Sequence, residues 1–277
     1  MAASAGIYLS QDPALPPNGG SWQGYTLGGL GLALILWLAW LGIRKRQYRN
    51  NRGTLEGWAS AHVYLGGIAL PVAATLHGGF QFGLNVHTLA YALMAGVILS
   101  GLYGLYTYLR FPPLLVRNRG DQSMDERLAE LDRIDKEALE TASRCDESVH
   151  TAVHSALDRT AVGGGFRDQL FARDRSRVLL PGTGKREGRN VLVANRGQRA
   201  VVDYLAQRIP DTSKHGEAER LRELLYVFGR RAELLQRLRR EISLQLRMKL
   251  WLAIHVPLTV ALLAALTVHV VTVFFYW

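Results

Sequence analysis

Four long apolar runs dominate the hydrophobic pattern of this 277-residue chain. The runs cover about Trp22–Ile43, Gly57–His77, Val86–Leu109 and Leu250–Tyr276. None of them contains Asp, Glu, Lys or Arg, and a helix that crosses a bilayer needs roughly 20 apolar residues at a rise of 1.5 Å each. The pattern therefore predicts three transmembrane helices in residues 22–109 and a fourth in 250–277, with residues 1–21 as an N-terminal tail.

Between the third and fourth runs, residues 110–249 form a polar insertion with its own helical periodicity. The stretch FPPLLVRNRG predicts a break after the third helix, and an amphipathic helix is expected over 123–159, with Ser123 and Glu126 as a capping box. Its apolar stripe comprises Leu128, Leu131, Ile134, Ala138, Ala142, Cys145, Val149, Ala152 and Ala156.

A second helical arm is predicted over 215–249. Its apolar positions recur with a seven-residue spacing and comprise Leu221, Phe228, Leu235 and Ile242, with Leu224 and Leu238 between them. This arm runs into the fourth span without a helix breaker, and we expect the two arms to pair as an antiparallel hairpin. Between them, the sequence VLVA predicts one short strand.

Charge placement predicts the orientation of the chain. Five of the 33 Lys and Arg residues follow the first span, within Arg44–Arg52, and the other 28 lie between Arg110 and Lys249. The positive-inside rule places both stretches in the cytoplasm and both termini outside, and we expect the protein in a bacterial inner membrane. The net charge of +10 favours contact with anionic membrane lipids, whereas a nucleic-acid partner is not expected because acidic residues alternate with the basic ones.

Five histidines lie in or beside the spans: His62, His77, His87, His255 and His269. The first two are 15 residues apart and the last two are 14 residues apart. At about 100° per residue, each pair returns to within roughly 60° of one helix face, with about 21–22 Å between its members. Two helices therefore offer one histidine each near the inner surface and one each near the outer surface.

Paired imidazoles at two matched depths suggest two metal centres, because a haem iron takes axial nitrogen ligands from opposite faces. Gly66 and Gly67 lie close to His62 and leave room for a flat ring, although ordinary small-residue helix packing would explain them too. Any one histidine alone would be explained by a hydrogen bond between helices.

The two stretches HVYLGGIALPVAATLH and HVPLTVALLAALTVH resemble the paired-histidine helices of membrane di-haem b-type cytochromes, over the four spans and not over the insertion. The resemblance implies an all-α, four-transmembrane-helix haem-binding bundle with a largely helical cytoplasmic insertion. It also implies two haem b groups, the inner held by His62 and His255 and the outer by His77 and His269. Electrons would then cross the membrane between a quinone pool or a protein partner and a second redox partner, within a larger complex.

Further residues are assigned supporting roles. His87 is either an alternative outer ligand, a partner of a haem propionate or part of a quinone pocket. Candidate partners for the inner propionates are Arg44, Arg46, Arg110 and Arg247. The outer side has no Lys or Arg, so outer propionates would need other donors or a partner protein.

Two other functions remain open. One is a transporter that binds a transition metal through these histidines, although the spans lack the carboxylates and thiols that usually accompany His. The other is a non-redox membrane scaffold with a cytoplasmic coiled-coil arm. A phosphate loop at GTGKR is not favoured because the required glycine and Ser/Thr are missing, and no set of catalytic residues is evident.

Overall fold

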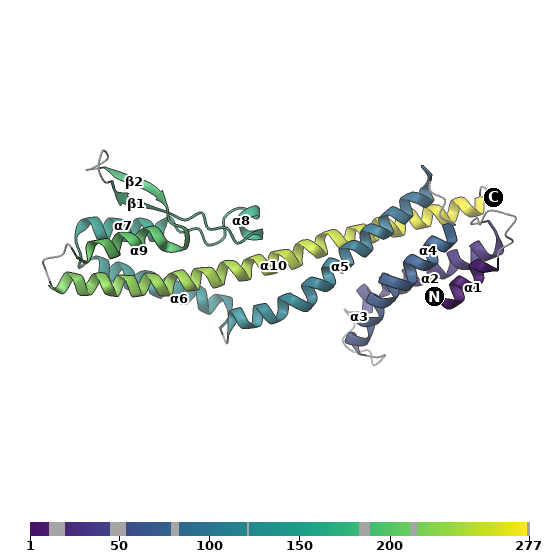
Figure 1. The fold of residues 1–277 in the computed structure, drawn as a ribbon, viewed down its shortest axis with the longest axis horizontal. Helices are drawn as coiled ribbons and strands as arrows, with labels where there is room; N and C mark the ends of the chain where they lie inside the picture. The colour runs from purple at the N-terminus through teal and green to yellow at the C-terminus, as the bar shows by residue number, and fades with distance from the viewer. Residues whose placement is uncertain are drawn as a thin grey trace. The chain divides into compact units, whose positions relative to one another are not determined.

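The computed structural model describes residues 1–10, 20–44, 54–78, 83–120, 122–182, 189–210 and 215–275. The chain is mostly helical, with one small two-stranded sheet. It divides into two compact units, of which the first comprises Met1–Leu109 and Lys249–Trp277 and the second comprises Arg110–Met248 (Figure 1). Two long helices, α5 (Val86–Arg119) and α10 (His215–Phe275), contribute residues to both units.

Four helical stretches are long and apolar enough to cross a membrane: Trp22–Arg44, Glu56–Gly78, Val86–Arg119 and Gly216–Phe275. Many of their large apolar side chains are exposed to the outside of the protein, as expected where lipid is the solvent. This confirms the four predicted spans and indicates an integral membrane protein. A short helix, α1 (Ala2–Leu9), lies in the region predicted as a tail.

The second span contains a π-helical turn that the sequence did not predict. It comprises α3 (Leu55–Tyr64), the turn η1 (Leu65–Ala69) and α4 (Leu70–Gly78). The Leu70 N–H donates to the carbonyl of Leu65, five residues back. Pro71 follows directly, and its ring would clash with the carbonyl four residues back in a regular helix, so the wider turn relieves the conflict.

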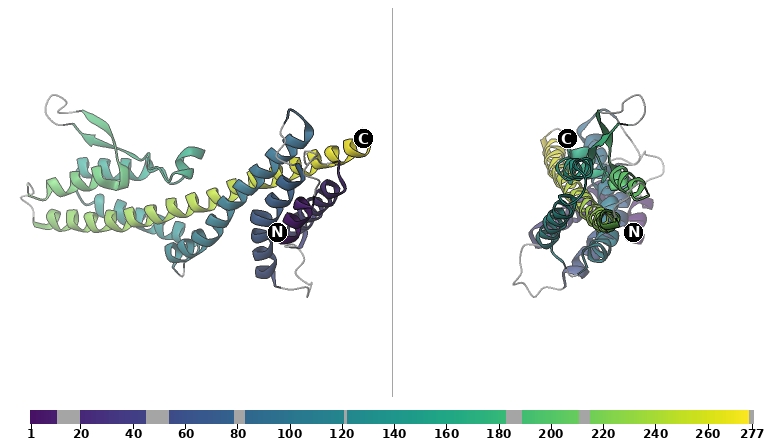
Figure 2. Two further views of the ribbon diagram at one scale, coloured as in Figure 1. Left: turned by 45° about the vertical axis from the view of Figure 1, so that its right-hand side comes forward. Right: turned by 90° about the vertical axis from the view of Figure 1, so that its left-hand side faces the viewer.

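The first unit is packed around a small apolar core. Helices α2 (Trp22–Arg44) and α4 run side by side, as Figure 2 also shows. The core residues come from α2, α4, α5 and α10 and comprise Ile35, Leu38, Leu70, Met94 and Leu262. All four spans therefore pack as one bundle.

Helix α5 continues past the predicted break. Pro112 and Pro113 lie inside it, although neither can donate a backbone hydrogen bond. Beyond the prolines, the helix is held by the second unit, because the Asn118 side chain donates to the Arg237 carbonyl at 2.8 Å and Arg119 pairs with Glu241 at 2.6 Å. These contacts compensate for the lost backbone bonds.

Within the described residues, the second unit adds seven further elements. They are α6 (Met124–Ala142), α7 (Glu147–Asp158), α8 (Phe166–Leu170), β1 (Arg177–Pro181), β2 (Asn190–Ala194), η3 (Arg196–Gln198) and α9 (Arg199–Arg208). Strand β2 confirms the predicted strand, and it pairs antiparallel with β1, with Arg177 opposite Ala194. In Figure 1 the strands lie over α7 and α9, and β1 packs on both helices.

The helix predicted over 123–159 is two helices. The predicted capping box is present, with Ser123 and Glu126 each bonding the backbone of the other. The helix ends at Ala142, and the chain restarts with Asp146 as the N-cap of α7. Short polar side chains at the break compete for backbone groups: the Ser143 hydroxyl donates to the Glu140 carbonyl at 2.7 Å. The break lets α7 pack against β1.

The core of the second unit confirms three of the four seven-residue positions predicted for the second arm, whereas the fourth, Ile242, is only half-buried. Leu221, Phe228 and Leu235 are buried, with α6, α7, β1 and α9 around them. The predicted apolar stripe of the first arm is wrong at Leu128, which is exposed. Its neighbour Arg127 is buried instead and pairs with the buried carboxylate of Glu241, so an ion pair replaces an apolar contact.

Candidate functional site

Three histidines from three spans meet in the first unit. His77 is the second-last residue of α4, His87 is the second residue of α5, and His269 lies in α10. Their ring centroids are 5.5 Å apart for His77 and His87, 6.1 Å for His77 and His269, and 5.2 Å for His87 and His269. One nitrogen of each ring lies within 4.8 Å of the others. We call these three residues the outer histidine cluster.

Glycines allow this close approach. A Cβ atom on Gly28 of α2 would lie 2.8 Å from Cε1 of His77, closer than real contacts. A Cβ atom on Gly78 would lie 2.6 Å from Nε2 of His87. Both positions therefore need glycine, because any larger residue would push an imidazole out of the cluster.

The orientation of His77 is fixed by a backbone hydrogen bond. Its Nδ1 lies 2.8 Å from the carbonyl oxygen of Gly24, which can only accept, so Nδ1 carries the proton and donates. In a neutral imidazole this leaves the Nε2 lone pair free. Histidines that bind metals characteristically donate the other ring N–H to a carbonyl or carboxylate in this way.

A large cavity adjoins the outer histidine cluster. Its volume is about 1200 Å³, above the roughly 300–1,000 Å³ typical of ligand pockets. All four spans line it, mostly with apolar residues. Gly29 and Gly31 belong to its wall, and a Cβ atom added at either would meet nothing within 4 Å. These two glycines leave open space beside α2, between the larger lining residues Leu27, Leu32 and Ile35.

His255 is oriented in a similar way near the other end of the α10 span. Its Nδ1 lies 2.8 Å from Oγ of Ser100, and that hydroxyl donates its single proton to the Val97 carbonyl. The Ser100 oxygen therefore accepts from Nδ1–H, and the Nε2 lone pair of His255 is left free. The ring also lies near Gly101 and 5.7 Å from the Trp251 ring.

His62, the predicted partner of His255, lies in α3 with its ring beside the Leu38 carbonyl of α2. Its Nδ1 is buried and has no hydrogen-bond partner among the described residues. The same holds for Nε1 of Trp251. Buried polar atoms without partners are costly in protein interiors, so these two nitrogens are candidates for contact with a bound group.

The other predicted residues are distributed as follows. Gly66 and Gly67 lie in the π turn, where Gly66 faces Leu38 and Gly67 faces open space. Arg44 is buried at the end of α2, and Arg46 lies outside the described residues. Arg110 and Arg247 belong to the second unit, where Nε of Arg247 donates to the Leu170 carbonyl at 3.0 Å.

The sequence did not predict which residues orient the histidines. Gly24 and Gly28 stand out only as small residues beside the proposed haems and Ser100 only as a possible quinone partner, because glycine and serine are common in membrane helices. Their role depends on the rotation of each helix about its axis, which the apolar pattern leaves undetermined.

Comparison of the chain with models of protein families, with characterised proteins and with solved structures gives no match.

The outer histidine cluster offers imidazole nitrogens, the donors that a haem iron takes as ligands and that other transition metals also accept. A haem bound here would be held by two of these imidazole nitrogens, which lie within 4.8 Å of one another. The adjoining cavity of about 1200 Å³ is where the rest of such a group would lie, and the hydrogen bond of His77 leaves its Nε2 available to a metal.

Proposed function

We propose that this chain is a membrane di-haem b-type cytochrome that carries electrons across the bilayer. The observation that supports it best is His77, whose ring lies 6.1 Å from that of His269 beside a large cavity while its Nδ1 donates to the Gly24 carbonyl. The oriented imidazole, the second imidazole and the space beside them are the three features that bis-histidine ligation requires.

Each histidine pair has a defined task in this proposal. His77 and His269 hold the outer haem, and His62 and His255 hold the inner one. The hydrogen bonds to Gly24 and Ser100 place the Nδ1–H of each ring, so that Nε2 is the nitrogen available to a metal, and they hold the rings in place. When bound, haem supplies one-electron chemistry, and the apolar walls of the bundle limit access of water to it.

The spacing along α10 supports two centres rather than one. His255 and His269 are 14 residues apart, which is about 21 Å along a helix. Two centres at these positions would carry an electron most of the way across a hydrocarbon core of about 30 Å. A quinone or a redox protein would then exchange electrons at each end.

A second candidate is a transition-metal site formed by all three residues of the outer histidine cluster. Three nitrogens within 4.8 Å of one another also suit a single zinc or copper ion, with imidazole as ligand. In that case His87 binds the ion directly, as His77 and His269 do. In the haem proposal it is a neighbour that supports the site.

The optical spectrum of the purified full chain tests these alternatives. The haem proposal predicts the reduced-minus-oxidised bands of low-spin haem b and two haems per chain. His62→Ala and His255→Ala should each remove the same half of the haem, and His77→Ala and His269→Ala the other half. His154→Ala, an exposed histidine of α7, is the matched control and should retain both.

His87→Ala separates the two candidates. Under the haem proposal the outer haem stays bound, whereas a three-histidine metal site loses its ion. A colourless protein that holds zinc or copper in a His87-dependent way would refute the haem proposal.

A further inference from the structure

The second unit contains a cleft lined by four arginines. Arg173 and Arg175 precede β1 and Arg177 is its first residue, and all three line the cleft. Arg196 reaches the cleft from the end of β2, because Arg177 is paired with Ala194 two residues earlier. The volume of the cleft is about 630 Å³, within the usual range for small-ligand sites.

Most of this positive charge is not neutralised by the protein. Arg175 pairs with Asp168 at 2.8 Å. Within the described ranges, Arg173, Arg177 and Arg196 have no carboxylate within 4.0 Å. Like charges brought together in this way repel one another, so the arrangement costs free energy unless an anion joins it.

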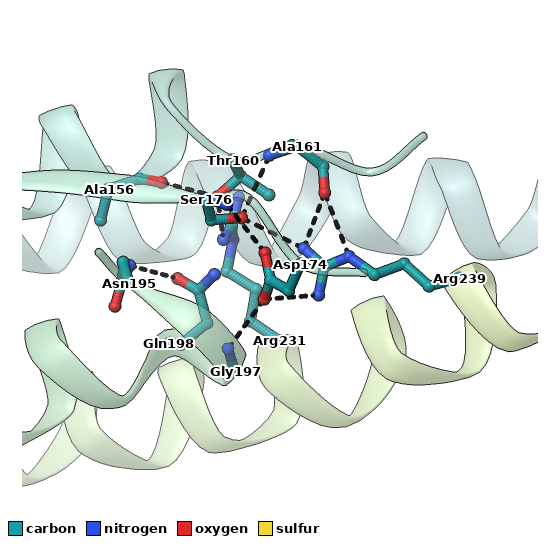
Figure 3. A network of polar contacts seen from close by, with 10 residues as sticks. All are labelled: Ala156, Thr160, Ala161, Asp174, Ser176, Asn195, Gly197, Gln198, Arg231 and Arg239. Carbon is teal, nitrogen blue, oxygen red and sulfur yellow. Dashed lines mark hydrogen bonds and ion pairs between the residues drawn. The ribbon is translucent and has the colours of Figure 1, made fainter. Parts of the chain in front are cut away.

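The one carboxylate in the cleft, Asp174, is already engaged, as Figure 3 shows. Its Oδ2 accepts from the Gly197 N–H at 2.7 Å and pairs with Arg239 at 2.9 Å, and its Oδ1 accepts from the Ser176 N–H at 2.9 Å. Burial alone would raise the pKa of Asp174, but these hydrogen bonds and the Arg239 guanidinium outweigh it and hold the pKa below its usual value. Asp174 is therefore held by Arg239 and the backbone, and Arg173, Arg177 and Arg196 are left without a carboxylate partner among the described residues.

Backbone strain marks the same place. Among the described residues, Ala172 and Gln198 are the two non-glycine positions with positive φ, at 51° and 62°. Ala172 directly precedes Arg173, and Gln198 follows Arg196 by two residues. Residues other than glycine rarely adopt this conformation, and such strain gathers where a binding site fixes the backbone.

We propose that this cleft binds a ligand carrying two or more phosphate groups. Arginine presents a planar fork of N–H donors that matches phosphate oxygens, and several arginines around one cleft favour a multiply charged anion over a single carboxylate. The ligand is either a free phosphorylated small molecule or the phosphorylated headgroup of a lipid. The proposal does not depend on haem.

The test uses the full chain in nanodiscs of neutral lipid. Inorganic pyrophosphate is titrated by calorimetry at low ionic strength, and flotation with vesicles containing a phosphorylated phosphatidylinositol is measured in parallel. The cleft variant is Arg177→Gln with Arg196→Gln. Neither arginine pairs with a carboxylate among the described residues, so the variant breaks no ion pair there. The control is Arg133→Gln with Arg222→Gln, two exposed arginines of α6 and α10 with the same loss of charge.

The cleft variant should bind pyrophosphate at least about tenfold more weakly, since each charge-assisted hydrogen bond to phosphate is a strong one. The control should stay within about twofold of the wild type. If the protein binds the vesicles but not pyrophosphate, and the cleft variant no longer binds the vesicles, the ligand is a lipid headgroup. If neither probe binds, or if both double variants behave alike, the proposal is refuted. Should the double variant misfold, Arg196→Gln alone provides the same comparison.

Discussion

Replacing Gly28 by alanine tests the outer site with a single methyl group. The added Cβ would lie 2.8 Å from Cε1 and 3.0 Å from Nδ1 of His77, whereas ordinary contacts begin at 3.4 Å. The ring would therefore retreat by about 0.6 Å, the difference between these distances. That movement stretches the 2.8 Å hydrogen bond from Nδ1 to the Gly24 carbonyl beyond the range of good hydrogen bonds.

Two free-energy costs of the substitution then add at His77. Overpacking costs about 1–3 kcal/mol, and the weakened hydrogen bond costs up to about 1 kcal/mol. Because the ring can move, we expect most of this cost in haem affinity rather than in protein stability. Haem should bind to the outer site about 10–100-fold more weakly, the range typical of losing a residue that orients a metal ligand.

Gly42→Ala is the matched control. It lies on the same helix, is exposed, and an added Cβ there meets nothing within 4 Å. Both variants gain the same helix propensity of about 1 kcal/mol, so that contribution cancels in the comparison. Titration of the haem-free protein with haem, followed by absorbance, measures the affinity of each site. The reasoning is wrong if Gly28→Ala and Gly42→Ala bind the outer haem equally well.

Three other substitutions follow from the structure. Gly31→Leu points into open cavity space, so we expect unchanged thermal stability together with loss of the outer haem; retention of both haems would mean that no porphyrin fills the cavity. Glu241→Ala strands the buried Arg127 and should lower the free energy of unfolding of the second unit by about 3–5 kcal/mol, whereas the exposed Glu233→Ala changes it little, as measured by urea denaturation. Asp174 has a lowered folded-state pKa, so its stabilising effect is complete above about pH 4 and is lost as pH falls through that folded pKa. Asp174→Asn should therefore be less stable near neutral pH and less sensitive to acid, and an unchanged pH profile would contradict this.

The sequence predicts those parts of the fold that depend on apolar length and period. The four spans follow from the length of uncharged runs, and the core positions Leu221, Phe228 and Leu235 follow from a seven-residue spacing. The capping box at Ser123 follows from a local pairing of two side chains with nearby N–H groups. Each of these signals lies within one element, so no knowledge of neighbouring elements is needed to read it.

Features that depend on contacts between elements were not predictable in the same way. From the sequence alone, Arg127 would be predicted to lie in solvent. It is buried because it pairs with Glu241, which lies 114 positions later in the chain. Strand β1 was not predicted, because the arginines beside it obscure its short apolar pattern. It forms a strand because β2 pairs with it. At the candidate site, the histidines were visible in the sequence, but the contact of Gly28 with His77 depends on how α2 is rotated.

The π turn at Leu65–Ala69 reconciles the two unequal histidine spacings. In a regular helix, a step of 15 residues leaves His77 about 60° past the face of His62, and a step of 14 leaves His269 about 40° short of the face of His255. A turn closed by an i→i+5 bond holds one more residue than an α-helical turn. The 15-residue step of the second span therefore behaves as one of 14, and both helices present their histidines with the same offset. Pro71 favours the wider turn. Although Pro71 contacts no haem in our proposal, it thereby gives the histidines of the second span the same rotational offset as those of α10.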